Sequence, residues 1–149
     1  MHTQNPDHRR LFSTRRLRPK RVLLLEDDAY TEVVLGRIFR RIHSSIEVTW
    51  IKSVAEAKAK LLCQQFDLII ADIYVEGTET GLDLWHLCER QHADLPFIFI
   101  SGLPVHEFFN AIGPASIAPP YLPKPLNMDE CTQLVSTVLL AESIRRRVV

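Results

Sequence analysis

The chain has few cysteines and few glycines, and it has no long apolar run. Its three cysteines, Cys63, Cys88 and Cys131, are far apart and form no C-x-x-C pair, which excludes a disulfide framework and a zinc ribbon. The five glycines form neither of the patterns that bind nucleotide phosphates. No stretch approaches the roughly 18 apolar residues that would span a bilayer, and no apolar signal core follows the basic start. We therefore expect a cytoplasmic globular protein.

The 149 residues correspond to about one domain, and 46% apolar with 24% charged residues is an ordinary globular composition. The net charge of zero hides an uneven distribution. Residues 1–20 hold six basic residues and one acidic residue, residues 21–144 carry a net charge of −8, and the arginines at 145–147 add +3. We expect a disordered basic extension over 1–19, one domain over 20–144 and a basic tail over 145–149. This acidic body does not fit a DNA-binding domain.

Strand-like segments alternate with helical segments along the whole chain. Apolar runs typical of strands buried on both faces occur at 22–25, 68–71 and 97–100, and further strands are predicted at 46–50 and 118–122. Helical spacing of apolar residues predicts helices over 29–42, 53–64, 82–91, 105–111 and 127–145. This alternation favours an α/β fold, with a doubly wound parallel sheet of five strands and helices on both of its faces.

Polar side chains follow the predicted strands at the points where these strands end. An acidic triplet at 26–28 ends the first apolar run, Asp72 ends the second, Ser101 follows the third, and Lys124 follows the last strand. Functional groups of parallel sheets gather at the carboxyl ends of the strands, so we expect these side chains to share one rim. Carboxylates on such a rim repel each other unless a cation lies among them, and Mg²⁺ prefers hard oxygen ligands. An aspartate beside the metal can accept a phosphoryl group, while a lysine and a hydroxyl contact the phosphate.

Four motifs resemble those of response regulator receiver domains. LLLEDD, FDLIIADIYVEG, FIFISG and YLPKP occur in that order between residues 20 and 144. The resemblance implies a flavodoxin-like fold with Asp72 as the phosphoacceptor. It further implies a metal site formed by Glu26, Asp27, Asp72 and the main-chain carbonyl of Tyr74, phosphate contacts from Ser101 and Lys124, a switch aromatic at Tyr121, and a cis peptide bond between Lys124 and Pro125.

The resemblance also implies a role in signalling. The resemblance implies a chemotaxis-type receiver of a two-component system. We expect it to be stand-alone, without an output domain, because only a short segment follows the last predicted helix. A histidine kinase or a histidine phosphotransfer protein would donate a phosphoryl group to Asp72 in a step that needs Mg²⁺ or Mn²⁺. The signal would then pass to a downstream protein target or onward by phosphotransfer, and a homodimer is one arrangement left open. Receivers are not counted as enzymes, so we expect no separate enzymatic activity.

The segment after Asp72 departs from the family's usual pattern. Glu76 stands where receivers usually have a proline, and the interval from Asp72 to Gly81 is one residue longer than usual. We expect a remodelled loop, in which Glu76 and Glu79 add negative charge near the site. We also expect the bulky Tyr74 to shield an acyl phosphate on Asp72 from water.

Other readings of this architecture differ at the acidic triplet. A flavodoxin-type flavin site would need a loop rich in Ser, Thr and Gly there, and a phosphoaspartate hydrolase would have a D-x-D arrangement instead of adjacent acids. A degenerate receiver stays open as an alternative, namely a protein-binding module that keeps the fold but is not controlled by phosphate. Within the triplet, Asp27 with Asp28 stays open as the metal pair in place of Glu26 with Asp27.

Overall fold

The computed structural model describes residues 18–43, 45–114 and 117–148, with side chains as far as Ala141. In this part of the chain, five strands alternate with five helices. They are β1 (Arg21–Leu25), α1 (Ala29–Ile42), β2 (Glu47–Ile51), α2 (Val54–Cys63), β3 (Leu68–Asp72), α3 (Gly81–Gln91), β4 (Phe97–Ser101), α4 (Val105–Ile112), β5 (Tyr121–Pro123) and α5 (Met128–Val148). The predicted basic extension lies outside the described residues except for Arg18 and Pro19, and so does Val149.

The strands form a single parallel sheet in the order β2-β1-β3-β4-β5. β1 lies inside the sheet, where Leu24 is in register with Trp50 of β2 and Ile70 of β3. This arrangement confirms the predicted doubly wound sheet with helices on both faces. Because every strand runs in the same direction, all their carboxyl ends meet at one edge, where the polar residues follow them.

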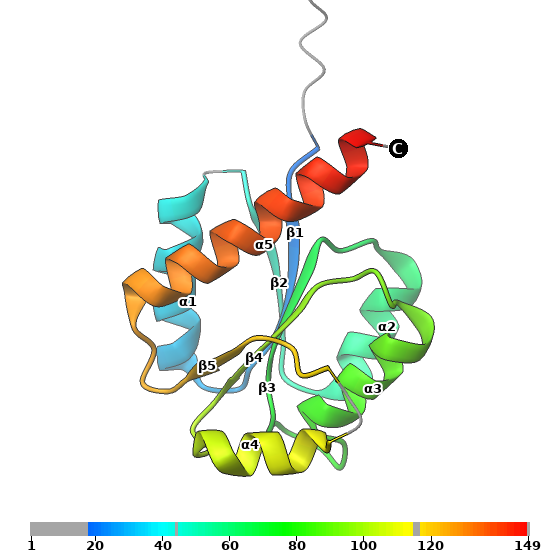
Figure 1. Cartoon of the computed structure of the whole chain (residues 1–149), viewed down its shortest axis with the longest axis vertical. Coiled ribbons are helices and arrows are strands. Elements are labelled where there is room, and N and C mark those ends of the chain that lie inside the picture. Colours follow the sequence, from blue (N-terminus) through cyan, green and yellow to red (C-terminus); the bar gives the residue numbers. More distant parts are fainter. Residues whose placement is uncertain (1–17, 44, 115–116, 149) are drawn as a thin grey trace, which may run out of the picture.

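Two apolar clusters, one on each face of the sheet, hold the helices in place. Successive side chains of a strand point to opposite faces, so Leu23 and Val22 of β1 belong to different clusters. The cluster of Leu23 includes residues of α2, α3 and α4, whereas the cluster of Val22 includes residues of α1 and α5. Figure 1 shows the same division, with α1 and α5 on one side of the strands and α2 and α3 on the other.

Two element boundaries differ from those predicted. The last strand begins at Tyr121 rather than at residue 118, because Pro119 and Pro120 have no backbone N–H to donate to a neighbouring strand. The last helix continues to Val148, so most of the predicted basic tail is helical. Arginine has a high helix propensity, and its charge is favourable near a helix carboxyl end.

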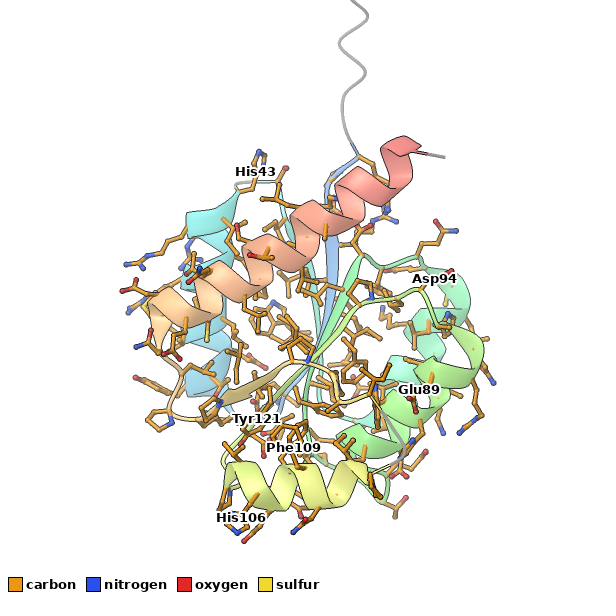
Figure 2. All side chains as sticks on the ribbon, viewed as in Figure 1. His43, Glu89, Asp94, His106, Phe109 and Tyr121 are labelled. Atoms are coloured by element: carbon orange, nitrogen blue, oxygen red, sulfur yellow. The ribbon has the colours of Figure 1, made fainter. Side chains whose placement is uncertain are left out.

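The chain enters and leaves the domain at the same end. Arg18, just before β1, forms an ion pair with the buried Asp67, which directly precedes β3. Figure 1 shows the start of β1 and the end of α5 at one end of the molecule and α4 at the other. In Figure 2, His43 and Asp94 lie toward the first end, whereas Phe109 and Tyr121 lie toward α4. Among the described helices, none combines the length and apolar character needed to cross a bilayer.

Substitution of a core leucine should show that the apolar clusters stabilise the fold. Leu35 of α1 is fully buried, whereas Leu62 of α2 is 90% exposed. We expect Leu35→Ala to lower the free energy of unfolding by about 2–5 kcal/mol, measured by urea denaturation. Leu62→Ala is the matched control, with an expected change below about 0.5 kcal/mol. Similar losses in the two variants would contradict this division of core and surface.

Candidate functional site

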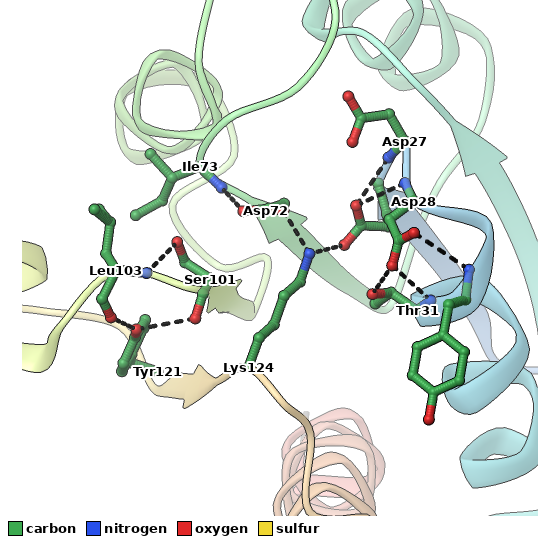
Figure 3. Close-up of polar contacts among 11 residues, drawn as sticks. Asp27, Asp28, Thr31, Asp72, Ile73, Ser101, Leu103, Tyr121 and Lys124 are labelled. Carbon is green, nitrogen blue, oxygen red and sulfur yellow. Dashed lines mark hydrogen bonds and ion pairs between the residues drawn. The ribbon is translucent and has the colours of Figure 1, made fainter.

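The ammonium group of Lys124 lies between two carboxylates at the carboxyl edge of the sheet (Figure 3). Its Nζ donates a hydrogen bond to Asp72 Oδ2 at 2.7 Å and lies 2.7 Å from Glu26 Oε2. Glu26 directly follows β1, Asp72 ends β3, and Lys124 directly follows β5. The ion pairs therefore join three strand ends, as the sequence pattern predicts.

Glu26 is a buried carboxylate, with 1% of its surface exposed. Its Oε1 accepts hydrogen bonds from the backbone N–H groups of Asp27 and Asp28, at 2.9 and 3.0 Å. Burial raises the pKa of Glu26, and the charge of Asp72 adds to this rise, while Lys124 and the N–H of Asp28 oppose it incompletely. Keeping Glu26 charged therefore lowers the free energy of unfolding.

Lys124 stays protonated at this site. Burial by itself would lower the pKa of its ammonium group, but the hydrogen bonds and charges of Asp72 and Glu26 outweigh burial and raise that pKa above its ordinary value. The backbone N–H of Lys124 donates to the carbonyl of Ser101 at 2.8 Å. The Lys124–Pro125 peptide bond, at which the family resemblance implies a cis isomer, is cis.

Asp27 and Asp28 have different environments. Asp28 caps helix α1, since its carboxylate accepts hydrogen bonds from the N–H and the hydroxyl of Thr31, at 3.0 and 2.7 Å. These bonds hold the pKa of Asp28 below its usual range. The exposed carboxylate of Asp27 has no hydrogen bond or ion pair within the described ranges, and it points away from Lys124 in Figure 3. This geometry favours Glu26 with Asp27 over Asp27 with Asp28 as the metal pair.

Ser101 and Tyr121 lie on the other side of the rim. The buried hydroxyl of Ser101 accepts a hydrogen bond from the N–H of Leu103 at 3.2 Å. The hydroxyl of Tyr121 donates to the carbonyl of Leu103, and the carbonyl of Ser101 is 3.1 Å away. The ring of Tyr121 stacks on Phe108 of α4, with ring centroids 4.4 Å apart. Tyr121 thus connects the β4–α4 loop to α4, and burial together with the charge of Asp72 raises its pKa.

The loop after Asp72 carries Tyr74, whose side chain is 64% exposed. An isolated bridge joins the backbone of Glu76 to Ser53, the N-cap residue of α2. Glu79 forms an ion pair with Lys58 of α2 at 2.6 Å. The extra negative charge expected from Glu79 is thus paired with a cation on the neighbouring helix.

Gly81, the first residue of α3, fits against the backbone at the carboxyl end of β3. Its N–H donates to the carbonyl of Ile73 at 2.7 Å, and a β-carbon at this position would lie 2.1 Å from the carbonyl oxygen of Asp72. Any larger residue must therefore displace the strand end that carries Asp72. In the sequence, Gly81 marks only the length of the loop after Asp72. An isolated glycine next to a helix start was the available signal for this close approach.

The site has the chemistry of a magnesium ligand set, although the described residues contain no cluster of three or more His, Cys, Asp or Glu side chains placed to hold a metal. Mg²⁺ usually needs only one or two protein carboxylates and keeps several waters. The available donors here are oxygens. Glu26 Oε2 is buried without a hydrogen bond of good geometry in the described part of the chain, and Asp27 is exposed beside it. These residues fit a divalent cation.

The pH dependence of stability should report the buried charge of Glu26. Because the folded-state pKa of Glu26 is raised above 4.5, the stability from its protonation is present below pH 4.5 and lost as pH rises through the folded-state value. We expect the free energy of unfolding of the wild type, minus that of Glu26→Gln, to fall over this window in the presence of a chelator. Urea denaturation at a series of pH values measures it, with exposed Glu47→Gln as control. A pH-independent difference would contradict the assignment.

A methyl group at Gly81 should disturb the strand end of Asp72. We expect Gly81→Ala to lower the free energy of unfolding by about 1–3 kcal/mol, because the backbone must shift to admit the β-carbon. Gly36→Ala in α1 is the matched control, since its β-carbon would meet its nearest neighbour at 3.8 Å. That substitution should stabilise the protein by up to about 1 kcal/mol. Equal changes in thermal unfolding would show that the contact at Gly81 is unimportant.

Comparison with solved structures gives many matches to receiver domains. The receiver domain of a protein described as a LuxO repressor, from Vibrio parahaemolyticus, has a TM-score of 0.74 and 22% identity, over 89% of this chain and 98% of that one. The receiver domain of an HD domain-containing protein from Pseudomonas fluorescens Pf-5 has a TM-score of 0.75 and 18% identity, over 89% and 95%. The non-phosphorylated HemR receiver domain from Leptospira biflexa has 26% identity and a TM-score of 0.65, over 80% and 94%.

These likenesses establish the flavodoxin-like receiver fold. A search of curated protein sequences gave no match. The sequence model of the response regulator receiver domain matches residues 22–136, from β1 to the first part of α5. The chain belongs to the response regulator receiver domain family.

Proposed function

We propose that Asp72 accepts a phosphoryl group from a histidine kinase or a histidine phosphotransfer protein, in a reaction that requires Mg²⁺ or Mn²⁺. The contact of Lys124 with both Asp72 and Glu26 carries this proposal, because it places a fixed cation beside a carboxylate at the open edge of the sheet. A carboxylate in such a place can attack phosphorus to form an acyl phosphate.

The side chains around Asp72 suit a transferred phosphoryl group. Lys124 is protonated and reaches Asp72 Oδ2, so it can neutralise charge on the phosphoryl oxygens. Ser101 accepts a hydrogen bond from Leu103, which leaves its own O–H able to donate to a phosphoryl oxygen. The N–H of Ile73 donates to Asp72 Oδ1 at 2.7 Å and fixes the orientation of the carboxylate.

Glu26, Asp27 and Asp72 would hold the metal ion with the main-chain carbonyl of Tyr74. When bound, the metal supplies positive charge that stabilises the transferring phosphoryl group. Glu26 would orient the site from its buried position at the end of β1, and the exposed Asp27 is free to turn toward the cation.

Phosphorylation would act on the surface around α4 and β5. A phosphoryl group that pulls the Ser101 hydroxyl toward itself would weaken the hydrogen bond that this hydroxyl accepts from the N–H of Leu103. The carbonyl of Leu103 in turn accepts a hydrogen bond from the Tyr121 hydroxyl. Because Tyr121 stacks on Phe108, a shift of this loop changes the packing of α4. We propose that a downstream protein target, or a second copy of the chain, reads this change in the cytoplasm as part of a chemotaxis-type pathway.

Phosphorylation by a small donor tests the proposal directly. We expect incubation with acetyl phosphate and Mg²⁺ to add one phosphoryl group, because Asp72 is a carboxylate activated at this rim. The adduct should be absent in a chelator and in Asp72→Asn, and present in Asp94→Asn, a control at an exposed aspartate far from the rim. Intact-protein mass spectrometry measures the adduct.

A protein without an adduct must also be tested with beryllofluoride, which mimics a short-lived acyl phosphate. Binding of beryllofluoride to the wild type but not to Asp72→Asn would support the acceptor role and indicate rapid hydrolysis, against the shielding expected of Tyr74. Failure of both reagents would support the degenerate receiver, a binding module independent of phosphate.

A further inference from the structure

The loop between β3 and α3 lacks the proline that usually stiffens it, yet contacts at several points hold it. The bridge from Ser53 fixes Glu76 in the middle of the loop. The N–H of Gly81 fixes the carbonyl of Ile73 at its start. The carboxylate of Asp83 accepts a hydrogen bond from the N–H of Thr80 at 2.7 Å and fixes its end. These three contacts do not hold the stretch around Gly77, whose φ is +94°.

Within the described residues, the ion pair of Lys58 and Glu79 joins this stretch of the loop to α2. Lys58 Nζ donates to Glu79 Oε2 at 2.6 Å, and each side chain is 41% exposed. Lys58 lies in the second turn of α2, whose N-cap residue is Ser53. The first two turns of α2, with its N-cap residue, therefore hold the loop by a backbone bridge from Ser53 and by the charged side chain of Lys58.

We propose that the Lys58–Glu79 ion pair positions the β3–α3 loop for metal binding, so that Lys58 increases the affinity of the site for Mg²⁺ without contacting the ion. This inference rests on the proposed function, in which the Tyr74 carbonyl of the same loop is a metal ligand. A loop held in its binding conformation loses less conformational entropy when the ion binds. Lys58 and Glu79 are thus positioning residues.

The sign of the effect separates positioning from simple electrostatics. Removing a positive charge near a cation site strengthens cation binding through Coulomb's law, and removing a negative charge weakens it. If Lys58 acts only through its charge, Lys58→Met should tighten Mg²⁺ binding while Glu79→Gln loosens it. If the ion pair positions the loop, both variants should bind Mg²⁺ more weakly.

The measurement is calorimetric titration of MgCl₂ into the unphosphorylated full chain. We expect Lys58→Met and Glu79→Gln each to raise the Kd for Mg²⁺ by about two- to fivefold, the range of an exposed ion pair. Lys60→Met is the matched control on the same helix, because Lys60 has no ion pair in the described part of the chain. It should leave the Kd unchanged or lower it. The charge swap Lys58→Glu with Glu79→Lys should restore most of the affinity.

The acetyl phosphate reaction gives a second readout. The variants should need more Mg²⁺ for half-maximal phosphorylation, with an unchanged rate at saturating Mg²⁺. Tighter binding by Lys58→Met, equal affinities of Lys58→Met and Lys60→Met, or no rescue by the charge swap would each overturn the inference and leave the proposed function intact. Absence of Mg²⁺ binding by the wild type would overturn both.

Discussion

An ion-pair network of Lys124 with Asp72 and Glu26 holds the carboxyl edge of this sheet together. Parallel strands bring their carboxyl ends to one edge, and in this chain that edge carries Glu26 directly after β1 and Asp72 at the end of β3. Two carboxylates so close repel each other, and one of them is buried. Lys124, which follows the edge strand β5, reduces this repulsion and connects that strand to the centre of the sheet.

The same network leaves the rim short of positive charge. One ammonium group faces Glu26 and Asp72, while Asp27 remains exposed beside them. Protonation of Glu26 relieves the excess in acid, and a divalent cation can relieve it at neutral pH. The cost of keeping Glu26 charged and the fit of these residues to a divalent cation thus have the same physical origin. The phosphoryl group that we propose for Asp72 would add further negative charge, and Lys124 lies where it could neutralise that charge.

Much of the fold follows from short-range sequence patterns. Continuous apolar runs located the buried strands, and the polar residues after them located the rim, because strand direction alone decides where those residues meet. The start of β5 was misplaced because Pro119 and Pro120 interrupt the strand ladder. The contact between Gly81 and Asp72 and the pairing of Lys58 with Glu79 depend on tertiary distances. No periodicity in the sequence encodes those distances, and each residue alone looks like an ordinary glycine or a surface charge.

The shared location of Arg18 and the end of α5 has a consequence for how this domain can be connected to other molecules. Both lie at the amino ends of the strands, on the side of the body opposite the rim of Asp72 (Figure 1). A tether, a surface attachment or a fused domain placed at either point would leave the rim clear. A partner protein could then approach the carboxyl edge of the sheet from open solvent, whichever molecule is joined to the opposite end of the domain.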